Sequence, residues 1–277
     1  MSSARRTFLR MVLAGAQCCA WLVTLAPRAN AAPASEALGP LDAVNLAGRQ
    51  RMLSQRATKA YLMLGQGIAP ARARALLAES IEQFDTQLAE LAALPANAAL
   101  DSARSSLAAH WHEMQTVLGA PPDVSGAQTL YDVNEAVQKA AHQLTLACEA
   151  RAPAPYAHLL NLAGRQRMLS QRMAKFFLYR TWGVNGDAAD MELELSHAHF
   201  NAVLIQLETS PLLDPAAHAA VAEVRGSWHD YEKLLGARDS LATMRGHAEA
   251  LAMASETVLA ACERVVTAVL RHALQAG

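Results

Sequence analysis

The chain has 277 residues, with 24 Lys or Arg against 25 Asp or Glu and a formal net charge of −1. A chain without an excess of basic residues is a poor partner for nucleic acid, which binds proteins that present a basic face. The four cysteines form no Cys-x-x-Cys step, so the usual sequence patterns of zinc, haem c and thiol-redox sites are excluded.

Residues 1–31 have the composition of an export signal. Arg5 and Arg6 precede a short apolar run over residues 11–25, and an Ala-x-Ala cleavage pattern ends at Ala31. The run is too short for a comfortable transmembrane helix. The segment RRTFLR resembles the twin-arginine export signal, although a general secretory signal with adjacent arginines would share these features. We expect cleavage near Ala31 and a periplasmic location for the rest of the chain.

A twelve-residue segment occurs twice. NLAGRQRMLSQR stands at residues 45–56 and again at residues 161–172, an offset of 116 residues. Weaker echoes follow in the same order, among them Trp111 with Trp228 and the Cys-Glu steps at 148–149 and 262–263. Each repeat is therefore a whole domain of roughly a hundred residues rather than one unit of a solenoid.

The repeat predicts two tandem domains after the signal, at residues 32–151 and 152–277. Within each copy, Pro residues and turns separate four segments in which apolar residues recur at spacings of three and four, the pattern of amphipathic helices. We therefore expect an all-α protein made of two tandem four-helix bundles related by a pseudo-twofold. Because the Ala-Pro-Ala-Pro linker at 152–155 is short, both bundles should begin at the same end, and the two repeated helices should run parallel.

The repeated helix is strongly basic. Arg49, Arg51, Arg56 and Lys59 fall within eleven residues without an acid among them, and like charges at these spacings destabilise an isolated helix. Gly48 stands one turn before Arg51 on the same face. A Gly inside a helix costs up to about 1 kcal/mol relative to Ala, and its usual advantage is close approach of another backbone or a ligand.

Pairing the two copies of this face would bring together Gly48, Arg51, Gly164 and Arg167. Facing guanidinium groups repel each other unless an anion lies between them, and their planar forked donors suit a planar oxyanion such as nitrate or nitrite. We therefore expect Arg51 and Arg167 to clamp a small anion and the two glycines to permit close helix approach. The alternative is that the arginines only form ion pairs with Asp and Glu of neighbouring helices. Four further side chains are candidates for hydrogen bonds to the ligand or the facing helix: Asn45, Asn161, Ser54 and Ser170.

No pattern in the chain predicts catalysis, a cofactor or a metal site. Two pairs of histidines, at 110 and 112 and at 197 and 199, are spaced by two residues, and on a helix such residues point in different directions. Paired carboxylates in a cleft pattern, a Ser-His-Asp arrangement and a glycine-rich phosphate loop are absent from the sequence. Cys148 and Cys262 lie in apolar stripes, which predicts buried free thiols.

The pattern Asn-x-Ala-Gly-x-x-Arg-Met-x-Ser-x-Arg, present in both repeats, resembles the signature of the PilJ-type sensor domain, the N-terminal domain of type IV pili methyl-accepting chemotaxis transducers. It is also similar to the periplasmic ligand segment of the nitrate/nitrite sensor kinases NarX and NarQ. In those kinases the Arg of the Gly-x-x-Arg-Met step contacts nitrate from each subunit of a dimer, so the resemblance implies Arg51 and Arg167 as ligand residues. Leu46 and Leu162 stand where the nitrate sensors carry a basic residue, which leaves the identity of the anion open.

These observations predict a periplasmic protein that binds a small oxyanion, nitrate or nitrite, and passes a signal to a membrane sensor kinase or chemotaxis receptor. The alternative is a ligand-free interaction module whose basic helix docks on an acidic face of a membrane receptor or of an exported respiratory enzyme. Substitution of Arg51 would separate the two hypotheses, because only the first predicts a loss of anion binding.

Overall fold

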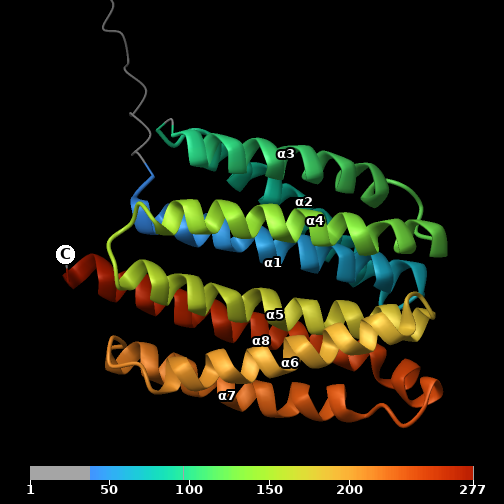
Figure 1. The fold of residues 1–277 in the computed structure, drawn as a ribbon. Helices are drawn as coiled ribbons and strands as arrows, with labels where there is room; N and C mark the ends of the chain where they lie inside the picture. Colours follow the sequence, from blue (N-terminus) through green and yellow to red (C-terminus); the bar gives the residue numbers. More distant parts are fainter. Residues whose placement is uncertain (1–37, 96, 277) are drawn as a thin grey trace, which may run out of the picture. The chain divides into compact units, whose positions relative to one another are not determined.

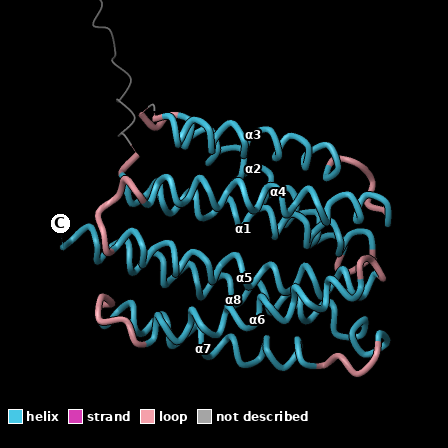
Figure 2. Tube along the Cα trace, in the orientation of Figure 1, coloured by secondary structure: helices cyan, strands magenta, loops and turns pink. Residues whose placement is uncertain are grey.

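The computed structural model describes residues 38–95 and 97–276, so the predicted export signal lies outside the described residues. These residues form α1 (Pro40–Gly65), α2 (Pro70–Ala92), α3 (Ala98–Leu118), α4 (Val124–Glu149), α5 (Tyr156–Trp182), α6 (Gly186–Glu208), α7 (Pro215–Gly236) and α8 (Leu241–Ala276). Figure 2 shows the short loops that join these helices. Within the two described ranges, no helix has both the length and the hydrophobicity of a transmembrane segment.

The helices form two four-helix bundles, α1–α4 and α5–α8 (Figure 1). The first helix of each bundle is central, because α1 packs on α2 and α4, and α5 packs on α6 and α8. The bundles meet where α1 lies along α5, and these two helices run in the same direction (Figure 1). The structure confirms the predicted all-α fold of two tandem bundles related by a pseudo-twofold, with the repeated helices parallel.

Side-chain caps explain where α3 and α4 begin. Asn97 precedes α3, and its side chain accepts hydrogen bonds from the backbone N–H groups of Ala99 and Leu100 at 3.0 and 3.3 Å. Asp123 precedes α4 and accepts from the N–H of Gly126 at 2.7 Å. These N–H groups have no partner inside the helix, so each cap stabilises the first turn.

A stacked aromatic pair occupies the equivalent place in each bundle. Phe84 and Trp111 stack with their ring centroids 3.7 Å apart, and Phe200 and Trp228 stack at 4.2 Å. Each pair joins the second helix of its bundle to the third. The correspondence between Trp111 and Trp228 that the sequence predicts is therefore confirmed.

The two cysteines of the described residues are buried free thiols, as their apolar stripes predict. Burial raises the pKa of Cys148 to about 11 and the pKa of Cys262 to about 12. Because the thiolate is the reactive form, neither side chain is a nucleophile at neutral pH.

Candidate functional site

Two arginines lie buried where α1 packs on α5. Arg51 of α1 is 1% exposed and Arg167 of α5 is fully buried. A Cβ atom at Gly48 would lie 3.2 Å from Nη2 of Arg51 and 3.8 Å from Nη2 of Arg167. A Cβ atom at Gly164 would lie 3.3 Å from Nη2 of Arg167 and 3.6 Å from Nη2 of Arg51. The structure thus brings together the four residues that the motif spacing predicts to meet, and the glycines leave room for both guanidinium groups.

Arg51 has polar partners but no carboxylate. Its Nη2 donates to Oδ1 of Asn161 at 2.9 Å, and its Nε donates to the backbone carbonyl three residues earlier at 3.4 Å. Its Nη1 lies 3.4 Å from Nδ1 of His142 on α4. No Asp or Glu among the described residues forms an ion pair with Arg51. Burial, together with repulsion from Arg165 and Arg167, lowers the pKa of Arg51 to about 9.

Arg167 has the carboxylate that Arg51 lacks. Its Nη1 donates to Oε2 of Glu263 on α8 at 2.9 Å, and its Nη2 donates to the backbone carbonyl of Asn45 at 3.3 Å. The other carboxylate oxygen of Glu263 accepts from Nη2 of Arg49 at 2.8 Å. Burial lowers the pKa of Arg167, and the charge of Glu263 opposes that shift. One glutamate therefore pairs with two arginines on this side of the α1–α5 interface.

The two motif asparagines have different surroundings. Asn161 links Arg51 to Glu149, because its Oδ1 accepts from the arginine and its Nδ2 donates to Oε2 of Glu149 at 2.5 Å. Asn45 meets Arg167 through its backbone carbonyl instead. Its side-chain Oδ1 is buried and has no hydrogen-bond partner among the described residues. Identical sequence therefore gives two different sets of contacts.

The two motif serines bond to their own helices. The hydroxyl of Ser54 donates to the carbonyl of Arg51 at 3.0 Å, and the hydroxyl of Ser170 donates to the carbonyl of Arg167 at 2.8 Å. The structure therefore places each serine directly beneath a candidate ligand arginine and uses its hydroxyl to hold the arginine backbone. Neighbouring helices reach the serines through their carbonyls, as Tyr231 does when it donates to Ser170 at 2.8 Å.

Further along the motif helices, Lys59 and Lys175 are fully buried. Nζ of Lys59 donates to Oε1 of Glu256 on α8 at 2.6 Å and to Oγ of Ser255 at 2.9 Å. Nζ of Lys175 donates to Oε1 of Glu135 on α4 and to Oδ1 of Asn134, both at 2.7 Å. Burial lowers the pKa of both lysines to about 8. Each lysine therefore reaches into the other bundle for its carboxylate.

Arg56 and Arg172 strengthen the same contacts. Nη2 of Arg56 lies 2.7 Å from Oε2 of Glu256, and Nη1 of Arg172 lies 2.7 Å from Oε1 of Glu135. Burial alone would raise the pKa of both carboxyls, but the adjacent lysine and arginine lower it to about 2. We call this set the lysine layer: Arg56, Lys59, Arg172, Lys175, Glu135 and Glu256. We call the other set the arginine layer: Arg49, Arg51, Arg165 and Arg167.

The contacts of the lysine layer correct one correspondence between the copies. The sequence matched the Cys-Glu steps at 148–149 and 262–263, an offset of 114 residues. In the structure, Glu135 and Glu256 occupy equivalent places beside the two lysines, an offset of 121 residues. The two offsets differ by seven residues, which is two helical turns, so the apolar stripe is the same for both and periodicity cannot distinguish them.

The corrected register identifies a residue that the sequence did not single out. At the offset of 121 residues, His142 on α4 corresponds to Glu263 on α8. His142 lies beside Arg51, and Glu263 lies in the equivalent place beside Arg167. A lone histidine on an amphipathic helix gives no sequence signal, and only the correct alignment of α4 with α8 would have revealed it.

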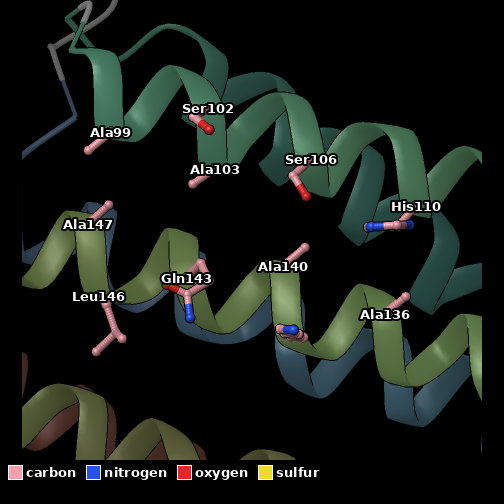
Figure 3. Close-up of a pocket in the computed structure, with 11 residues that line it drawn as sticks. Ala99, Ser102, Ala103, Ser106, His110, Ala136, Ala140, Gln143, Leu146 and Ala147 are labelled. Atoms are coloured by element: carbon pink, nitrogen blue, oxygen red, sulfur yellow. The ribbon is translucent and has the colours of Figure 1, made fainter.

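A groove of about 760 Å³ lies elsewhere, between α3 and α4 (Figure 3). Figure 3 shows Ser102, Ser106 and His110 of α3 on one side, with Gln143 and Leu146 of α4 on the other. Alanines make up most of the remaining lining, and no motif residue contributes to it. Since the groove carries no grouped charges and no catalytic constellation, the α1–α5 interface remains the candidate site.

One histidine of each pair lies beside a glutamate. Nε2 of His197 lies 2.7 Å from Oε1 of Glu232, and Nδ1 of His110 lies 3.5 Å from Oε2 of Glu113. In the part of the chain that the structure describes, no three His, Cys, Asp or Glu side chains are grouped as a metal site would require.

The fold and this interface define a class of all-helical protein in which two bundles pair their basic motif helices across a pseudo-twofold. The family model described as PilJ, Type IV pili methyl-accepting chemotaxis transducer N-term, matches residues 35–116 and 155–258. These segments cover more than half of the chain, so the chain belongs to this family. No curated protein and no solved structure shows a significant match. Membership indicates a sensory role that serves a membrane receptor, rather than a catalytic role.

Proposed function

We propose that this chain is a periplasmic receptor for a small oxyanion, nitrate or nitrite, exported by its N-terminal signal. In this proposal Arg51 and Arg167 bind the anion at the α1–α5 interface. Gly48 and Gly164 provide the space, and Asn161 orients Arg51. A membrane sensor kinase or chemotaxis receptor then reads the bound state.

The observation that carries the proposal is the unbalanced positive charge of the arginine layer. Glu263 pairs with Arg49 and Arg167, but Arg51 has no ion-pair partner among residues 38–95 and 97–276. A buried charge without an opposite charge is strongly unfavourable, and the lowered pKa of Arg51 is a consequence of that burial. A bound anion would supply the missing charge.

The chemistry of the two side chains favours a planar oxyanion. A guanidinium group has five N–H donors in a planar fork, and only three of those of Arg51 are used in the contacts described above. Guanidinium is also weakly hydrated, so it tolerates burial better than an ammonium group. Two such forks that converge on one space can share the oxygens of nitrate or nitrite.

The burial of the basic motif argues against the docking alternative. Arg51, Arg56 and Lys59 are 1%, 8% and 0% exposed. Arg56 and Lys59 are moreover already paired with Glu256. An acidic partner could not reach these charges without opening the interface between α1 and α5, so the predicted docking face does not lie on the surface.

The position of the arginines suggests how binding is transmitted. Arg51 belongs to the first bundle and Arg167 to the second, so an anion held by both would link the bundles. A ligand shifts a conformational equilibrium towards the arrangement that it binds more tightly. Since α1 and α5 are 26 and 27 residues long, a change in their spacing at the arginine layer would be carried to the ends of both bundles.

Isothermal titration with sodium nitrate, matched against sodium chloride, tests the proposal. We expect saturable binding of one nitrate per chain. Arg51→Gln should weaken binding at least about tenfold, because a hydrogen bond to a charged group contributes about 1.5–3 kcal/mol and 1.4 kcal/mol corresponds to a factor of ten. The same variant should keep its melting temperature, because it removes an unpaired buried charge.

Arg74→Ala is the matched control, since Arg74 is an exposed arginine on α2. This variant should bind nitrate like the unaltered protein. Equal nitrate affinity in Arg51→Gln and Arg74→Ala would remove Arg51 from the site. No saturable binding of nitrate or nitrite by the folded protein would overturn the proposed ligand.

A further inference from the structure

The two sides of the arginine pair differ in the side chain that lies beside each arginine. On the α8 side, Glu263 presents two carboxylate oxygens, one 2.9 Å from Nη1 of Arg167 and the other 2.8 Å from Nη2 of Arg49. On the α4 side, the equivalent residue is His142, which lies 3.4 Å from Nη1 of Arg51. The motif helices are identical here, so the difference comes from α4 and α8 alone.

Glu263 makes the contacts that a bound oxyanion would make. Its two oxygens each accept from a different arginine of the repeated motif, and the pairs Arg49–Glu263 and Arg167–Glu263 both lie within 3 Å. The chain therefore carries its own anion on this side. A second anion on the α8 side would meet the negative charge of Glu263.

The α4 side has the matching cations, but its carboxylate, Glu149, bonds to Asn161 instead of to an arginine. Arg165 is the counterpart of Arg49, and no acidic side chain of the described residues forms an ion pair with Arg165 or Arg51. His142 is neutral in its present contact, because a guanidinium group can only donate and Nδ1 must therefore accept. A neutral histidine beside two cations therefore leaves both of them without an ion pair.

We propose that the anion lies on the α4 side of the Arg51–Arg167 pair, where Arg165 is a further donor, and that His142 takes up a proton from solvent and donates to the anion when it binds. On the α8 side, Glu263 permanently fills the equivalent place. The inference rests on the proposed function and deepens it, because it names the position of the site, a further ligand residue and a stoichiometry of one anion per chain.

The charges around His142 determine the direction of the proton coupling. The groups that face it are Arg51 from α1, Arg165 from α5 and Glu149 from its own helix. Burial and the two arginines lower the pKa of His142, and Glu149 opposes them. An anion adds negative charge beside the imidazole and raises its pKa again, so the complex holds more protons than the free protein. Nitrate affinity must therefore rise as pH falls, by at most about tenfold per pH unit for a single proton.

The experiment is nitrate titration calorimetry between about pH 5.5 and 8, in pairs of buffers with different ionisation enthalpies. For the unaltered protein we expect one nitrate per chain, net proton uptake on binding and tighter binding at the lower pH. His142→Gln should bind nitrate with an affinity that no longer changes with pH and without proton uptake.

A second variant copies the α8 side onto the α4 side. His142→Glu gives Arg51 and Arg165 the carboxylate that Glu263 gives Arg167 and Arg49. We expect this variant to lose nitrate binding and to melt at a higher temperature than the unaltered protein, which shows that it is folded. His112→Glu adds the same charge at an exposed position of α3 and should bind nitrate normally.

The outcomes separate the inference from the proposed function. Nitrate binding by the unaltered protein with the same pH dependence and proton uptake in His142→Gln would overturn the inference and leave the receptor function intact. Normal nitrate binding by His142→Glu would do the same. Absence of nitrate binding by the unaltered protein would overturn both.

Discussion

The lysine layer and the arginine layer use the same repeated sequence in opposite ways. In the lysine layer, Lys59 and Lys175 find equivalent partners in the two copies, because Glu256 and Glu135 occupy matching positions. In the arginine layer, only one of the two central arginines has a carboxylate. Where the copies agree, each lysine has its own carboxylate within the protein, and we assign the layer to structure.

The difference between the layers originates outside the motif. Helices α4 and α8 supply the partners of both layers, and they have kept the glutamate beside the lysines while they diverged beside the arginines. Strict internal repetition of a motif therefore does not show that both copies have the same function. Its neighbours decide which copy gains a carboxylate partner.

The largest expected effect comes from breaking the lysine layer. Glu256→Gln leaves fully buried Lys59 without a carboxylate, and removal of one partner of a buried pair costs about 3–5 kcal/mol. Urea denaturation should show this loss in the free energy of unfolding. Glu135→Gln should have a similar effect, because it removes the partner of Lys175.

Glu249→Gln is the matched control, since Glu249 is an exposed glutamate on the same helix. Its free energy of unfolding should change by less than about 0.5 kcal/mol. The double variant Lys59→Met with Glu256→Gln should recover much of the lost stability, because it removes both buried charges. A loss in the double variant as large as in Glu256→Gln would contradict this account.

Acid should weaken the lysine layer without any substitution. The pKa of Glu135 and that of Glu256 are lowered to about 2 from an ordinary value of 4.5. A lowered carboxyl pKa means that the unfolded chain binds protons first, so the stabilisation is complete above about pH 4.5 and is lost as pH falls towards 2. Thermal unfolding followed across this range should show a falling melting temperature.

The double variant Lys59→Met with Glu256→Gln again provides the comparison for the acid experiment. It lacks one of the two titrating carboxyls, so its melting temperature should fall less steeply over the same pH range. Parallel curves for the two proteins would show that other carboxyls dominate the acid response.

The smallest expected effect on stability comes from the arginine layer. In Gly48→Ala the new Cβ would lie 3.2 Å from Nη2 of Arg51, so the flexible end of that side chain must shift by a few tenths of an ångström. Ala favours a helix over Gly by up to about 1 kcal/mol, which offsets this crowding. We expect the free energy of unfolding to change by less than about 1 kcal/mol, while calorimetry shows severalfold weaker nitrate binding.

Gly246→Ala controls for helix propensity, because a Cβ at Gly246 on α8 would meet nothing within 4 Å. It should stabilise the fold slightly and leave nitrate binding unchanged. Equal nitrate affinity in Gly48→Ala and Gly246→Ala would show that the space at Gly48 is not used by the ligand.

Sequence reasoning predicted the architecture well because each element has a local cause. Apolar spacings of three and four define the helices, and proline stands at the start of α1, α2 and α7. The twelve-residue repeat required two equivalent domains, and the short linker required parallel motif helices. Trp111 and Trp228 matched correctly because large aromatic residues are rare enough to align without ambiguity.

The sequence by itself determined that Arg51 and Arg167 would meet, since the motif, its glycines and the pseudo-twofold leave little choice. Only the tertiary structure decided what surrounds them. The partners come from α4 and α8, where two registers seven residues apart bury the same apolar stripe, so the pattern that defines a helix cannot choose between them. The contacts in the structure identify the register in which His142, rather than Glu149, is the counterpart of Glu263. That choice gives Arg167 a carboxylate and leaves Arg51 without one.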